Sequence, residues 1–183
     1  MATAPSLCER ISNSGDSTMN EVSIKPASLY DTDYQLWVDQ TVSKLKSRDF
    51  GDLDLENLIE EIESLGRSEK HAISSYLMRL CEHLLKIKYW ESERELCLRG
   101  WKREVLNFSL QIQEDLEASP SLKAFLQNVF FKQYKNGRKL FLNASELTSK
   151  LIPEEPDFTL EQALDETGFL CMNEGQGTFL NLY

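Results

Sequence analysis

The sequence contains few cysteines, histidines, glycines and prolines, and it lacks the short motifs that announce common chemistries. No CxxC or CxxxC spacing occurs among the cysteines, which argues against a zinc site and a disulfide framework; they are Cys8, Cys81, Cys97 and Cys171. No apolar run approaches the roughly 18 residues that a membrane-spanning helix needs. A glycine-rich phosphate loop, a nucleophile elbow and an HExxH motif are all missing, so the sequence indicates no familiar enzyme class.

Negative charge, in contrast, is abundant. The chain has 30 Asp and Glu against 20 Lys and Arg, which gives a net charge of -10 at pH 7. Such a chain repels nucleic acid and anionic membranes unless its basic residues gather on one face. The N-terminal residues have neither the basic nor the apolar region of a secretory signal. We therefore expect a cytoplasmic protein without a membrane segment.

The composition predicts one domain between two tails. Hydrophobic residues make up 41% of the 183 residues, which is enough for one core. The Ser, Thr, Asn and Gly content of residues 1–26 predicts a disordered N-terminal tail, with Met1 and Met19 both open as starts. We expect a helical domain over residues 27–170 and a C-terminal tail over residues 171–183.

The spacing of apolar residues predicts an all-α bundle of about five helices, with one long helix over about residues 53–90. Gly66 is expected either to bend this helix or to let another helix approach it closely. The first helix is expected over residues 31–47 and the third over residues 93–117. A fourth helix is expected after an N-cap at Ser119, ending near residue 136 or continuing to about residue 147. Thr159 and Gln162 form the capping box of a short last helix.

The long helix carries a continuous apolar face. Its apolar residues follow the spacing i, i+3, i+4, i+7 and i+10 in the first part and continue at helical spacing after Gly66. We therefore predict that both parts face the core. The predicted core residues are Leu58, Ile62, Leu77, Leu84 and, on the fourth helix, Phe125.

Several segments carry a family resemblance. They are YDTDY at 30–34 with Trp37, LDLENLIEEIESLGRSEK at 53–70, HLLK at 83–86, Trp101, SPSL at 119–122, and the section with Pro153, Pro156 and TLEQALDE. Together they resemble the bacterial domain-of-unknown-function family twenty-nine, common in cyanobacteria. The resemblance covers about residues 29–170 and implies an all-helical fold with no established activity. The family pattern has Gln-Pro where this chain has Trp90-Glu91, and a basic residue where it has Ser109.

Five polar residues on the long helix form the candidate polar site: Glu60, Glu63, Arg67, His83 and Lys86. Such groups can hold a hard cation, clamp an anion or move a proton. The commoner interpretation is a solvated acidic face, a salt bridge and a half-buried histidine. Glu60 and His83 are 23 residues apart, which is about 35 Å on an unbent helix. We therefore predict separate structural contacts rather than one site, with no metal and no cofactor.

Three functions remain open from the sequence. The favoured one is a non-catalytic module that binds another, unidentified protein, and self-association stays open. The second is a nucleic-acid-associated regulator or toxin partner, because basic residues alternate with aromatic ones between Lys86 and Arg103. Acidic residues dilute that cluster, so a basic helix that packs against the acidic long helix is the alternative. The third is an enzyme or metal protein built on the carboxylates and His83.

Overall fold

The computed structural model describes residues 28–165, and these residues form helices connected by turns and short irregular segments. The predicted all-α class is therefore confirmed for the described part of the chain. The expected tails over residues 1–26 and 171–183 lie outside the described residues. Contacts divide the chain into two compact units, with the division between Asn57 and Leu58.

The first unit, described over residues 28–57, contains α1 (Leu29–Thr32) and α2 (Tyr34–Ser47). The single predicted helix over residues 31–47 is wrong, because Asp33 separates the two and its carboxylate caps α2 by accepting from the Leu36 N–H. The Tyr30 ring packs edge-on against Trp37, whose indole N–H donates to the Asp54 carboxylate at 3.2 Å.

The long helix α3 runs unbroken over Leu55–Tyr89, as predicted, and the division between the units falls inside it. The close approach of another helix expected at Gly66 is wrong. The helix continues through this residue, and a Cβ added there would have no other atom within 4 Å. The sequence pattern could not show this, because a glycine in phase with an apolar face looks the same whether or not a neighbour is present.

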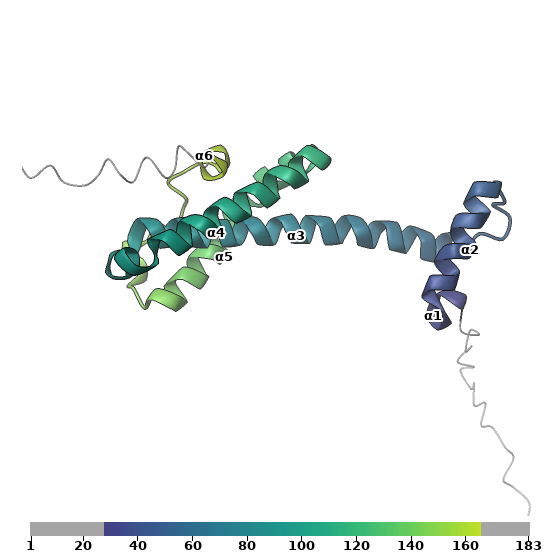
Figure 1. Ribbon diagram of the computed structural model, residues 1–183, viewed down its shortest axis with the longest axis horizontal. Helices are drawn as coiled ribbons and strands as arrows, with labels where there is room; N and C mark the ends of the chain where they lie inside the picture. The colour runs from purple at the N-terminus through teal and green to yellow at the C-terminus, as the bar shows by residue number, and fades with distance from the viewer. Residues whose placement is uncertain (1–27, 166–183) are drawn as a thin grey trace, which may run out of the picture. The chain divides into compact units, whose positions relative to one another are not determined.

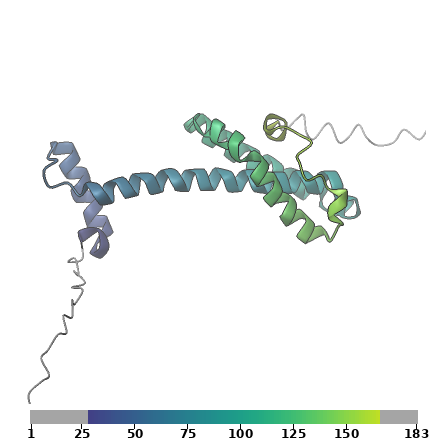
Figure 2. The same ribbon diagram turned by 180° about the vertical axis from the view of Figure 1, so that it is seen from behind.

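The second unit builds its core on the later part of α3. Helices α4 (Glu91–Ala118) and α5 (Leu122–Ser145) lie beside that part of α3 (Figures 1 and 2). Most of the side chains that these three helices bury against one another are apolar. The fully buried members include Ile73, Leu77, Leu80, Cys81, Leu84, Ile112, Leu126, Tyr134 and Phe141. Burial raises the pKa of the Cys81 thiol to about 12, so this residue acts as a small apolar side chain.

A glycine does set one helix crossing, but it is Gly137 on α5. A Cβ added there would lie 2.6 Å from the Met78 carbonyl oxygen and 2.9 Å from the Glu82 nitrogen, both of them α3 backbone atoms. Only glycine lets the two backbones come this close. Helix α5 continues past Gly137 to Ser145. Of the two ends expected from the sequence, near residue 136 or near residue 147, the later one is therefore correct.

The chain returns after α5 through a 3-10 turn (Ser149–Leu151) to α6 (Leu160–Leu164). The Thr159 hydroxyl accepts from the Gln162 N–H and the Gln162 side chain accepts from the Thr159 N–H, which confirms the predicted capping box. The N-cap predicted at Ser119 is wrong. Residues 120 and 121 form a turn, and the Ser119 hydroxyl donates to Glu69 at 3.3 Å.

The predicted core is right for the later part of α3 and wrong for the earlier part. Leu77 and Leu84 are fully buried, and Phe125 is partly buried against the core. Leu58 is only half-buried, and Ile62 keeps 61% of its surface exposed. The reason is the position of α4 and α5, which lie beside the later part of α3 and not beside its earlier part in the second unit (Figures 1 and 2).

Candidate functional site

The first group of predicted site residues, Glu60, Glu63 and Arg67, lies on the earlier part of α3, where α4 and α5 do not cover the helix. Glu60 is exposed, and Arg67 forms an ion pair with Glu63 at 3.3 Å. Both side chains of this pair keep more than 60% of their surface in solvent, at 63% and 66%. An exposed pair at i and i+4 contributes at most about 0.5 kcal/mol. These three residues therefore form a solvated charged surface rather than a pocket.

The second group surrounds Glu82, a residue that the sequence interpretation missed. Its carboxylate is buried, with its side chain 5% exposed. One oxygen accepts from Arg79 at 2.7 Å and the other from Lys86 at 2.8 Å. A buried carboxylate needs such partners because its desolvation is costly. Lys86, predicted as part of a polar site, thus neutralises a buried charge on its own helix.

His83 lies beside this ion-pair network at the edge of the core. Its Nδ1 is 2.9 Å from the Arg79 carbonyl oxygen, so Nδ1 carries the proton and donates. The ring packs at a tilt against Phe108, with 5.8 Å between ring centroids. Burial is the main cause that lowers the pKa of His83, and the neighbouring Lys86 and Arg79 charges act in the same direction. The neutral ring is therefore the resting form.

The five predicted residues do not form one site. The structure brings Glu63 to Arg67, and it brings His83 and Lys86 to the surroundings of Glu82. Because α3 is unbroken, the 23 residues from Glu60 to His83 separate these groups by about 35 Å. Within residues 28–165, no group of three or more His, Cys, Asp or Glu could hold a metal ion.

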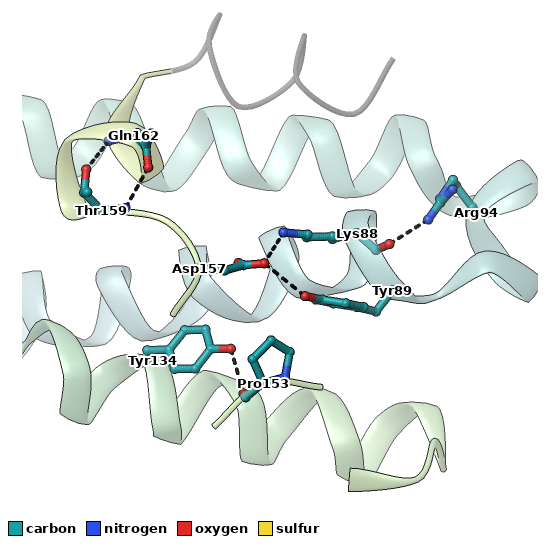
Figure 3. Close-up of polar contacts among 8 residues, drawn as sticks. All are labelled: Lys88, Tyr89, Arg94, Tyr134, Pro153, Asp157, Thr159 and Gln162. Atoms are coloured by element: carbon teal, nitrogen blue, oxygen red, sulfur yellow. Dashed lines mark hydrogen bonds and ion pairs between the residues drawn. The ribbon is translucent and has the colours of Figure 1, made fainter. Parts of the chain in front are cut away.

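A third polar group fastens the returning chain to the end of α3 (Figure 3). Asp157 accepts from both the Lys88 ammonium and the Tyr89 hydroxyl, the latter at 3.2 Å. Burial, and then the Asp157 charge, raise the pKa of Tyr89. The Tyr134 hydroxyl donates to the Pro153 carbonyl at 2.9 Å. Lys88 and Tyr89 belong to the basic and aromatic cluster considered for nucleic acid, and here they hold the connection in place.

Two further features of the second unit were not found from the sequence. A hollow of about 520 Å³ lies between α4, α5 and α6, and its apolar lining is Leu116, Leu160 and Leu164. Ser109, at the position where the family pattern has a basic residue, is completely buried, and its hydroxyl has no hydrogen-bond partner among the described residues. Neither feature brings together an acid, a base and a nucleophile.

The earlier part of α3 in the second unit exposes several apolar residues. Ile59, Ile62 and Leu65 expose 56%, 61% and 70% of their surfaces, and they lie on one side of the helix. Glu61 and Glu63 border this side. Among the described residues of the second unit, no helix covers it (Figures 1 and 2). We call these five residues the open face of α3.

In the part of the chain that the structure describes, no helix is long and apolar enough to cross a membrane. No curated protein and no solved structure matches the chain. One family model does match, over residues 29–169, and its description is "Domain of unknown function DUF29". The match extends from α1 through α6, across the open face of α3 and the buried ion pairs. The chain therefore belongs to the DUF29 family, as the segments from YDTDY to TLEQALDE indicated.

Proposed function

We propose that this protein is a non-catalytic module that binds another protein through the open face of α3. The observation that carries this proposal is the exposure of Ile59, Ile62 and Leu65 on neighbouring turns of one helix. Single exposed apolar residues are ordinary, but a contiguous apolar patch on a helix is typical of a protein-binding surface. An amphipathic partner helix can contact such side chains at the spacing i, i+3 and i+6 to i+7.

The charge around this face supports a partner with basic residues. Between Leu58 and Leu65 the sequence has three carboxylates and no Lys or Arg. Glu61 and Glu63 border the apolar residues, where a partner's Lys or Arg can reach them while its apolar side chains pack at the centre. Charge at the rim of an interface steers the encounter and selects the partner more than it adds affinity. Nucleic acid is disfavoured as the partner by the same carboxylates.

The polar residues support a structural role more than a catalytic one. His83 donates its Nδ1 proton to a backbone carbonyl, and Lys86 is used by the buried Glu82. Glu60 is about 35 Å away along α3. A catalytic proposal would need an acid and a base within reach of one reacting atom.

Site-specific cross-linking in the native cell tests this function. A photoreactive aromatic amino acid replaces Ile62 in the full-length chain, and the matched control places it at Asn128, an exposed polar position on α5. We expect a discrete cross-linked protein from position 62 that position 128 does not give. Reversing charge with Glu61→Arg and Glu63→Arg should remove this product. If position 62 gives no product beyond those of position 128, the proposed function is wrong.

A further inference from the structure

We propose that a protein bound by the open face of α3 is a second copy of this chain, and that it docks through the outer face of α4. This inference rests on the proposed function, because it identifies the partner of the same surface. The outer face of α4 consists of Leu96, Arg99, Arg103, Leu106 and Leu110.

The outer face of α4 has the spacing of a helix-packing surface. Its five residues follow i, i+3, i+7, i+10 and i+14, which is the spacing of the positions that meet in paired helices. Leu96, Leu106 and Leu110 expose 85%, 40% and 45% of their surfaces. Three exposed leucines on one side of a helix are apolar surface without an evident structural use in the single chain.

The two arginines on this face are accessible. Arg99 is exposed, and the Arg103 side chain keeps 76% of its surface in solvent. Arg103 forms an ion pair with its neighbour Glu104 at 3.6 Å, a long and exposed contact that contributes little. Both guanidinium groups are therefore accessible to a carboxylate of another chain.

The two faces complement each other in both apolar and charged groups. The leucines of α4 can pack on Ile59, Ile62 and Leu65 of a second chain. The arginine stems can then lie on the same apolar surface, while their heads reach Glu61 and Glu63 at its border. Pairing α3 with α3 of another copy would instead bring the acidic segments together, and like charges across an interface are unfavourable.

The same chain cannot make this contact. Trp101, Val105 and Ile112 lie on the opposite side of α4 and face the core of the second unit. The outer face of α4 therefore turns away from α3 of its own chain. Because every copy has both faces, a two-fold dimer makes the contact between α3 and α4 twice and leaves neither face open.

Charge reversal with rescue tests the inference, with sedimentation equilibrium as the measurement. The α3 variant carries Glu61→Arg and Glu63→Arg, and the α4 variant carries Arg99→Glu and Arg103→Glu. Wild type should be a dimer. Each variant alone should dimerise about 100-fold more weakly, since like charges then meet at both contacts. A mixture of the two variants should recover the dimer, because each contact in the mixed dimer again joins opposite charges.

Two control variants separate this contact from a general effect of charge. Lys132→Glu with Lys135→Glu makes the same charge change on α5, where both lysines are exposed. Glu60→Arg changes the side of α3 away from the apolar residues. Both controls should stay dimeric, and circular dichroism should show the same helix content in all variants. A monomeric wild type, a dimer that persists in both reversal variants, or a mixture that stays monomeric would overturn the inference.

The outcomes also separate this inference from the proposed function. A monomeric wild type that still gives a specific cross-link at position 62 to a different protein overturns only the second copy as partner. A monomeric wild type without that cross-link overturns both. A cross-link from position 62 to residues of α4 in another copy, located by peptide mass spectrometry, supports both.

Discussion

Two parts of α3 have apolar residues at a similar spacing but different surroundings: residues 58–71 and residues 73–89. Both have apolar residues at helical spacing on one side. In the later part Ile73, Leu77 and Leu80 are fully buried, whereas in the earlier part Ile62 and Leu65 keep more than half of their surfaces exposed, at 61% and 70%. Apolar periodicity therefore tells which side of a helix avoids water. It does not tell whether the same chain or another one covers that side.

The polar residues of the two parts differ in the same way. The ion pair between Glu63 and Arg67 is exposed on both sides, whereas Glu82 is buried and accepts from two cations. Solvent screens the first pair, and the low dielectric around the second makes any missing partner costly. Equal substitutions in the two parts should therefore have unequal effects, and three such pairs test the comparison. A fourth pair compares Gly66 with Gly137, the glycine of α5 that packs against the later part of α3.

The largest difference is expected from truncating an apolar side chain. Leu84→Ala should lower the free energy of unfolding by about 2–5 kcal/mol, because it leaves a cavity among fully buried residues. Ile62→Ala should change it by less than about 0.5 kcal/mol. Urea unfolding measures both, with each substitution placed in the Arg99→Glu and Arg103→Glu variant so that dimer contacts do not contribute. Equal losses at the two positions would mean that the chain itself covers the open face.

The two glycines give the next difference, and here even the sign should change. Gly137→Ala places a methyl group 2.6 Å from the Met78 carbonyl, so α3 and α5 must separate at a cost of about 1–3 kcal/mol. Gly66→Ala meets no atom within 4 Å and should stabilise the helix by about 0.5–1 kcal/mol. Thermal unfolding of both variants measures this. A stabilising Gly137→Ala would show that the helices do not cross this closely.

The third pair compares the two carboxylates. Glu82→Gln leaves Lys86 without its charged partner, although the Lys86 side chain is only 14% exposed. The substitution should lower the free energy of unfolding by about 1–3 kcal/mol. The loss is smaller than for a fully enclosed pair because the other partner, Arg79, is 48% exposed. Glu63→Gln should cost less than about 0.5 kcal/mol. Urea unfolding at low and at high salt measures both. Strong salt dependence of the Glu82 effect would contradict the burial that distinguishes it.

The helices of this fold were predictable from the sequence because their signals are local. The periodicity of 53–90, the Thr159 capping box and the buried positions of Leu77 and Leu84 all follow from neighbouring residues. The break at Asp33 and the turn after Ser119 were missed, since Asp and Ser residues that suit an N-cap lie close together near both helix starts. Cap identity depends on backbone geometry that several nearby residues can adopt.

The surroundings of the candidate residues were not predictable in the same way. That Glu82 rather than Glu60 is buried, and that Gly137 rather than Gly66 is the close contact, depends on where α4 and α5 cross α3. The contacts between α5 and α3 join residues that are distant in sequence, such as Gln133 and Ser74, which are 59 positions apart. The sequence of a single chain holds no local signal that predicts such contacts.

The smallest effect is expected from the two histidines and concerns pH. Burial lowers the pKa of His83 from its ordinary value of 6.5, so the unfolded chain binds a proton at higher pH than the folded one. The contribution of His83 to stability is therefore complete above pH 6.5 and is lost as the pH falls from there toward the folded pKa. Replacing the ring with His83→Gln should flatten the decrease in unfolding free energy below pH 6.5, whatever it does to the stability at neutral pH. His71→Gln removes an exposed histidine from the earlier part of α3 and should leave the slope as in wild type. Urea unfolding across this pH range decides the matter, and equal slopes for wild type and His83→Gln would show that the ring of His83 is not held neutral by the fold.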